Sequence, residues 1–247
     1  MAVEEGRLTL DTPVHEVWPE IHILTGAEKD RHIRMRHLAT HTSGWMTEQG
    51  PGEVWLYNNA ACTAGHAAIG RIYGLSGDRV APLVQERIAA EIGASSWDCY
   101  HYAESFASGQ HGQPGPKLAI DSSLRDLTRY GYLWLRKGVW NGAQLVPRDY
   151  ALEARSNQTA DLDGHYGYWW FTNDRKILLP GAPEDAFFHV GNGREERRSV
   201  CLIIPSLDLV AVVGTSARAY DITSGYRSRP MTQVDLWARK VLATIRI

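Results

Sequence analysis

Small and apolar residues dominate the chain from Asn59 to Tyr73, where alanine recurs up to Ala68 and isoleucine follows at positions 69 and 72. This density predicts a tightly packed, buried helix. Apolar positions within residues 33–39 predict a shorter helix that ends at the Thr42-Ser43-Gly44 turn. A further helix is predicted over residues 80–92, with Gly93 as its stop.

The second half of the chain begins with a predicted helix from Ser123 to Gly138, opened by a sequence similar to a capping box. Short runs rich in β-formers follow, separated by turn residues. These runs are residues 166–171, 186–190, 200–204 and 209–213. Pro205-Ser206-Leu207-Asp208 has the composition of a hairpin connection, and Pro230 begins a closing amphipathic helix. Helices, an antiparallel meander and a closing helix together predict one α+β domain over residues 1–247, with helices packed on an antiparallel sheet.

Two stretches lack such periodicity. Residues 9–30 are expected to form loops and short turns. Residues 99–119 are polar and rich in Gly, Pro, His and Ser, and we expect an irregular insertion at the rim of a pocket.

Composition excludes several functional classes. A formal net charge of −2 with scattered basic residues argues against nucleic-acid binding. The three cysteines (Cys62, Cys99 and Cys201) form no CxxC pair, which argues against a disulfide framework or structural zinc; Cys62 and Cys201 are predicted to be buried. No run approaches the ~18 apolar residues that span a membrane. The start has no signal peptide, so we expect a cytoplasmic chain, or a periplasmic or secreted one if an upstream segment exists.

The chemistry is centred on Tyr57 and Asn59, which follow the Gly50-Pro51-Gly52 breaker and open the small-residue helix. On a tight turn, both polar ends can point into one cleft. A tyrosine acts as a base only if a cationic neighbour lowers its pKa from about 10 toward neutrality. A purely structural turn is the competing interpretation of this pair.

Motifs in a fixed order carry a resemblance to a known family. They are Arg36-His37-Leu38-Ala39-Thr40-His41-Thr42-Ser43-Gly44, then Tyr57-Asn58-Asn59, then His189-Val190-Gly191 before a strand hairpin. The chain resembles the serine β-lactamase and penicillin-binding-protein superfamily, in particular class C β-lactamases and their esterase-like relatives. Residues 3–14 and 121–138 are similar to that branch as well. The resemblance implies a β-lactamase/transpeptidase-like fold and acyl transfer from a small ester, amide or lactam to water, without a cofactor or metal.

In that family the nucleophile is the serine of a Ser-x-x-Lys motif. No serine in these 247 residues is followed three residues later by lysine; Ser122-Ser123-Leu124-Arg125 has arginine in that place. We therefore expect a fold without the family's N-terminal strands and nucleophile helix. The missing core strands predict an exposed sheet edge, and hence self-association or a complementing N-terminal segment.

The resemblance also implies roles for individual residues. Tyr57 would be the general base, Asn59 would orient the substrate, and His189 would replace the third-motif lysine as a positive charge or hydrogen-bond partner. Gly191 would keep a strand edge open, and the backbone N–H of Asn192 would form half of an oxyanion hole. Trp169, from the aromatic stretch 166–170, would line the pocket, while alternate members of that stretch face the core.

Other candidates have simpler explanations. His37 and His41 are four residues apart, but the glutamate of a catalytic zinc motif is absent between them, which favours a hydrogen-bonded turn that positions the Tyr57 loop. Ser43 lacks a Gly-x-Ser-x-Gly context, and nothing near Cys62 in the sequence would lower its thiol pKa.

Three hypotheses for the function remain. The first is a serine hydrolase whose nucleophile comes from a separate segment or chain. The second is a catalytically inactive descendant that binds a ligand or partner. The third is a hydrolase without a covalent step, in which Tyr57 and His189 activate water.

Overall fold

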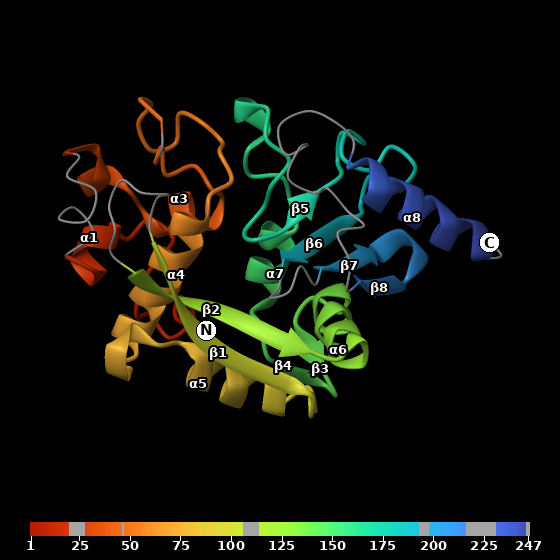
Figure 1. Ribbon diagram of the computed structural model, residues 1–247, viewed down its shortest axis with the longest axis horizontal. Helices are drawn as coiled ribbons and strands as arrows, with labels where there is room; N and C mark the ends of the chain where they lie inside the picture. Colours follow the sequence, from red (N-terminus) through yellow and green to blue (C-terminus); the bar gives the residue numbers. More distant parts are fainter. Residues whose placement is uncertain (20–27, 46, 106–113, 193–197, 216–230, 246–247) are drawn as a thin grey trace. The chain divides into compact units, whose positions relative to one another are not determined.

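The computed structural model describes the chain except for residues 20–27, 46, 106–113, 193–197, 216–230 and 246–247 (Figure 1). The chain forms two compact units. Unit 1 comprises Met1–Ala89 and Asp98–Ile120, and unit 2 comprises Ala90–Trp97 and Asp121–Ile247. Because the chain passes between the units three times, neither is a simple sequence segment. The single domain over residues 1–247 stays a prediction.

Helices make up most of unit 1. The helical elements of its described part are α1 (Val14–Val17), a 3₁₀ helix (Glu28–His32), α3 (Met35–Ala39), α4 (Asn59–Ile72), a 3₁₀ turn (Ser76–Asp78) and α5 (Ala81–Val84), which continues as a π-helical stretch (Gln85–Ala90). The predicted helices at 33–39, 59–73 and 80–92 are present as α3, α4 and α5 with its continuation, and the residues predicted as loops and short turns contain two further short helices. In α4 the small residues are buried, as expected, and the helix contacts α1 and α3. Gly93 has a φ of +65°, as a C-terminal stop requires.

The prediction of an irregular insertion over residues 99–119 is wrong for its two ends. β1 (Trp97–Ser105) and β2 (Pro114–Ser122) pair with each other as a two-stranded sheet. The glycine and proline content led to the loop interpretation, whereas the aromatic residues Trp97, Tyr100 and Tyr102 favour a strand. Residues 106–113 of this stretch lie outside the described residues, and its place at a pocket rim stays a prediction.

Unit 2 is built on a four-stranded antiparallel sheet in the order β5-β6-β7-β8. The strands are β5 (Phe171–Thr172), β6 (Phe187–Asn192), β7 (Arg198–Ile204) and β8 (Leu209–Thr215). β7 and β8 are joined at the predicted Pro205–Asp208 connection, with Ile204 opposite Leu209. The first β-rich run is shorter than predicted, because only its last residue, Phe171, enters a strand; Tyr166 makes an isolated bridge to Phe171. Two-residue strands β3 (Val139–Trp140) and β4 (Ala143–Gln144) flank the Asn141-Gly142 turn.

Three helices complete unit 2: α6 (Leu124–Leu135), α7 (Arg148–Ala154) and α8 (Thr232–Thr244). Helix α6 packs against β7 and β8. It comes so close at Gly131 that an added Cβ would lie 2.6 Å from Val210 Cγ1 and 2.8 Å from Cys201 Sγ. No helix in the described part of the chain is long and apolar enough to cross a bilayer.

The first turn of α6 depends on Ser123 and Asp126. Ser123 Oγ accepts a hydrogen bond from Asp126 N at 3.2 Å, so the predicted cap is present. The Asp126 carboxylate instead accepts from Ser96 N at 2.7 Å and pairs with Arg129. Burial alone would raise the pKa of Asp126, but these donors outweigh it and the pKa is lowered. The buried carboxylate therefore ties residue 96 to the helix.

We predict that Asp126→Ala lowers the free energy of unfolding by about 1–3 kcal/mol, because Ser96 N–H loses its acceptor. Since the folded pKa is lowered, this stabilisation is present above the unfolded pKa of about 3.9 and is lost as the pH falls through the folded pKa. Urea unfolding of both proteins at pH 7 measures the difference. The exposed Asp121→Ala is the control, with a change within about 0.5 kcal/mol; equal effects of the two substitutions would refute the role of Asp126.

Candidate functional site

Tyr57 is held by the turn that follows α3. His41 has a left-handed backbone with a φ of 57° and is buried. Its carbonyl accepts from Leu56 N at 3.0 Å, and its Nδ1 accepts from Asn58 N at 3.3 Å. The His41 and Tyr57 rings lie 4.1 Å apart between centroids, tilted by 34°. One residue thus contacts the tyrosine ring and binds the backbone on both sides of it.

The two asparagines after Tyr57 have different roles. Asn58 is the N-cap of α4, and its Oδ1 accepts from Ala61 N at 2.8 Å. Its Nδ2 donates to Leu56 O at 3.0 Å, so the side chain is buried and fully engaged. Asn59 is the first residue of α4 and is exposed, whereas Tyr57 is half-buried. Asn59 is therefore accessible to a ligand and Asn58 is structural.

His37 and His41 do not form a metal pair on one helix face. Helix α3 ends at Ala39, and the left-handed His41 lies beyond it. His37 Nδ1 accepts from Arg34 N at 3.1 Å, just as His41 Nδ1 is engaged by Asn58 N. Both rings thus bind the backbone through the same nitrogen, and the expected hydrogen-bonded turn is confirmed for His41.

The second group of candidates lies on β6 in unit 2. β5 pairs with β6 only at Phe187 and Phe188, while β7 pairs with β6 along its whole length to Asn192. Among the described residues, the other edge of β6 from His189 to Asn192 therefore has no strand beside it. At Gly191 an added Cβ would lie 2.7 Å from Ser199 Oγ, so only glycine fits here without displacing that side chain.

The imidazole of His189 is neutral at pH 7. Desolvation by the surrounding protein lowers the pKa of His189 to about 4, although the side chain keeps an exposed face. Even an unperturbed histidine, with a pKa of about 6.5, is mainly uncharged at pH 7. The Trp170 ring lies edge-on at 6.1 Å between centroids. Such an imidazole offers a hydrogen bond rather than the positive charge of the family's lysine.

The aromatic stretch alternates as expected. Tyr166, Tyr168 and Trp170 are buried, whereas Trp169 is half-exposed. Trp169 also has a φ of 65°, in the left-handed region that a bulky side chain rarely adopts. The backbone therefore presents this ring, and not its neighbours, outside the core of unit 2.

The candidate residues thus form two groups. Tyr57 and Asn59 belong to unit 1, whereas unit 2 carries Trp169, His189, Gly191 and Asn192. That the two groups face one cleft stays a prediction. Ser43 is buried in the His41 turn, where its Oγ accepts from Trp45 N at 3.4 Å. Cys62 is half-buried, and burial raises the pKa of the Cys201 thiol to about 12, which makes Cys201 a poor nucleophile.

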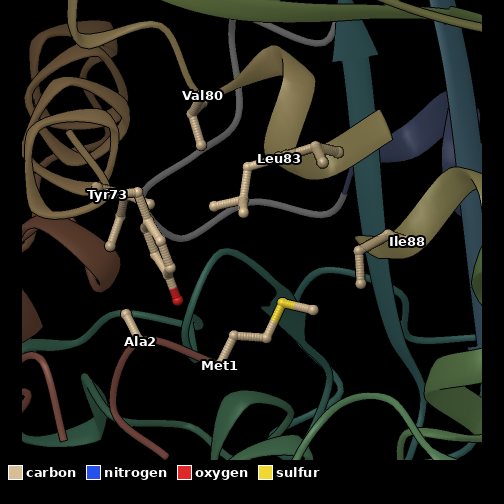
Figure 2. Close-up of a pocket in the computed structure, with 8 residues that line it drawn as sticks. Met1, Ala2, Tyr73, Val80, Leu83 and Ile88 are labelled. Atoms are coloured by element: carbon tan, nitrogen blue, oxygen red, sulfur yellow. The ribbon is translucent and has the colours of Figure 1, made fainter. Parts of the chain in front are cut away.

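A separate apolar pocket lies in unit 1 (Figure 2). Figure 2 shows the Tyr73 ring at one side, with its hydroxyl directed toward Met1 and Ala2. The pocket is lined by Met1, Ala2, Ile69, Tyr73, Val80, Leu83, Val84 and Ile88. None of these is a candidate site residue, so this pocket is distinct from the surroundings of Tyr57.

The comparisons with known proteins agree with the motifs. A profile of the Beta-lactamase family matches residues 1–225. The chain belongs to the β-lactamase family. An uncharacterised protein of Alkalihalophilus pseudofirmus is 25% identical over a 242-residue alignment that covers 85% of this chain and 67% of that protein.

Solved structures show the same fold. A class C β-lactamase variant superposes with a TM-score of 0.64 and 14% identity, covering 99% of this chain and 78% of that one. A family VIII carboxylesterase superposes with a TM-score of 0.65 and 13% identity, and the match covers 97% of this chain and 78% of the esterase chain. The resemblance to this superfamily and the α+β, β-lactamase/transpeptidase-like fold are thereby confirmed.

Sequence reasoning missed two residues that organise the β-lactamase-family motifs in unit 1. Asn58 had a usable signal, since asparagine before a run of helix-forming residues is a preferred N-cap. Lys29, whose ammonium group binds the backbone carbonyls of Gly44, Thr47 and Gln49, belongs to no motif and had no signal.

We predict that Asn58→Ala lowers the free energy of unfolding by about 0.5–2 kcal/mol through loss of the α4 cap. Asn59→Ala is the matched control one residue away, and its effect is expected to be smaller because that side chain is exposed. Urea unfolding of the three proteins measures both values. An equal or larger loss for Asn59→Ala would contradict the assignment of Asn58 as the structural asparagine.

A second prediction concerns His189. Its folded pKa lies below that of an unfolded histidine, so the unfolded chain binds more protons between about pH 6.5 and pH 4. This histidine therefore makes the fold less stable as the pH falls through that window. In NMR titration we expect the resonance that disappears in His189→Gln to have a midpoint near pH 4; a midpoint near 6.5 would contradict the desolvation of the ring.

Proposed function

We propose that this β-lactamase-family chain forms the base and oxyanion parts of a serine hydrolase for small esters, amides or lactams. The observation that carries the proposal is the fixed position of Tyr57, half-buried at the start of α4 and held on both sides by His41. Membership of the β-lactamase family supports acyl transfer as the reaction.

The proposed reaction has two steps. Because His189 is mainly neutral, the lysine of the Ser-x-x-Lys segment would be the cation that keeps Tyr57 as a phenolate. A serine Oγ–H gives its proton to this phenolate while Oγ attacks the carbonyl carbon; the bond to the leaving group then breaks, and that group takes the proton from Tyr57. Water repeats the sequence and releases the acid. The backbone N–H of Asn192, on the open edge of β6, would stabilise the oxyanion. Neutral His189 would donate or accept a hydrogen bond, Gly191 would leave room for the substrate, and Asn59 and Trp169 would contact it.

In this proposal the nucleophile comes from outside these 247 residues, because none of their serines has a lysine three positions later. The covalent route therefore takes its serine from a separate segment or chain. The same fact favours a second candidate function, a binding module for a ligand or partner that keeps the fold without turnover. A third route, in which Tyr57 and His189 activate water directly, needs no serine.

We predict that co-expression with a neighbouring Ser-x-x-Lys segment from the same genome gives one fluorophosphonate adduct per complex and hydrolysis of p-nitrophenyl esters. Tyr57→Phe should then lower kcat/KM by about 10²–10⁴-fold, the range for loss of a general base. Tyr132→Phe, on the exposed face of α6, is the matched control and should leave the rate unchanged.

The alternatives give different results in the same assay. An adduct on the 247 residues alone would show that they contain a nucleophile. Slow turnover without an adduct, lost in Tyr57→Phe, would favour the water route. Neither adduct nor turnover in the presence of the added segment would leave the binding module as the function.

A further inference from the structure

Lys29 binds one loop through all of its ammonium protons. It lies half-buried in the 3₁₀ helix Glu28–His32. Its Nζ lies 2.9 Å from Gly44 O, 2.6 Å from Thr47 O and 3.0 Å from Gln49 O. A lysine has three N–H donors and no acceptor, so these three carbonyls account for its whole donor capacity.

The loop is folded tightly around this contact. Gly44 has a φ of +73°, and an added Cβ would lie 2.5 Å from Gln49 O. Thr47 donates to Gly44 O through both its backbone N–H (3.2 Å) and its Oγ1 (2.7 Å). Three converging carbonyl dipoles repel one another unless a cation lies between them, so the Lys29 charge stabilises this arrangement.

A second contact comes from the residue next to Lys29. The buried Asp30 carboxylate accepts from Trp45 Nε1 at 3.0 Å. Lys29 and Asp30, which are consecutive in the 3₁₀ helix, therefore bind the same loop. Lys29 binds backbone carbonyls of the loop, and Asp30 binds the side chain of Trp45.

The ends of this loop lead directly to Tyr57. Thr42 O, just before the Gly44–Gln49 loop, accepts a hydrogen bond from Gly52 N, just after it, at 2.8 Å. The two segments that flank the loop therefore lie side by side. One residue before Thr42 is His41, whose carbonyl and Nδ1 bind the N–H groups of Leu56 and Asn58 and whose ring contacts Tyr57. The chain that carries the Lys29 contacts is therefore connected to the His41 turn by both sequence and the hydrogen bond between Thr42 and Gly52.

We propose that Lys29 is a positioning residue for Tyr57, acting through the Gly44–Gln49 loop and the His41 turn. The expected effect of Lys29 on turnover rests on the proposed function. Its effect on the backbone around Tyr57 is independent of any reaction.

The test uses Lys29→Ala and hydrogen exchange resolved by NMR at the Leu56 and Asn58 amides. Loss of the ammonium contacts should speed exchange at both amides on the order of tenfold or more. Lys240→Ala, at an exposed position of α8, is the matched control and should change neither amide. Lys29→Met keeps the apolar stem without the charge, and serves if the alanine variant does not fold.

Propylammonium supplies the atoms that Lys29→Ala removes, so at millimolar concentration it should restore slow exchange at both amides. Tetramethylammonium has no N–H donor and should not, at the same ionic strength. In the complex with a Ser-x-x-Lys segment, Lys29→Ala should lower kcat/KM by about 10²-fold, as for a misplaced catalytic group, and propylammonium should recover it.

Unchanged exchange at Leu56 and Asn58 in both variants would overturn the proposal, even if the Gly44–Gln49 loop itself became mobile. Faster exchange that tetramethylammonium reverses equally well would overturn the role of the N–H contacts. Faster, propylammonium-sensitive exchange in a protein without hydrolase activity would support the positioning role and reject the proposed function instead.

Discussion

The hydrogen bonds of His41 to the backbone on either side of Tyr57 fix the N-terminal end of α4. Because His41 adopts a left-handed backbone, its carbonyl and its ring nitrogen can both reach the segment 56–58. Without these bonds, the N-cap of α4 and the Tyr57 ring would lose their common support. The small residues of α4 are buried, and the helix packs against α1 and α3. This packing holds the body of the helix whose N-terminal end His41 fixes.

In unit 2, part of β6 has no strand beside it on one edge among the described residues, and the core next to it stays covered. The two-residue β5 covers β6 only at Phe187 and Phe188, both of which are buried. Beyond them, β6 carries His189 and Gly191 on an edge that is polar or lacks a side chain. A strand edge of this kind offers backbone hydrogen bonds to a small ligand or to another segment of chain.

The sequence predicted what depends on local pattern. The alanine-rich run predicted α4, and the Pro205–Asp208 segment predicted the β7–β8 connection. The aromatic stretch predicted that some of its members face the core, without specifying which ones. β1 and β2 were missed because nearby glycines and prolines outweighed the strand-forming aromatic residues. The hydrogen-bonded turn at His41 was predicted, but its partners Leu56 and Asn58 were not, and the contacts of Lys29 depend on backbone carbonyls that tertiary folding brings together.

The left-handed backbone of Trp169 has a consequence for the evolution of this chain. The other non-glycine residues with positive φ are polar, whereas Trp169 is the bulkiest, and this conformation costs about 1–2 kcal/mol for a residue with a Cβ. Selection for stability alone would replace the tryptophan by glycine or asparagine. Under the proposed role of Trp169 in substrate contact, folding stability and ligand binding would favour different residues at position 169.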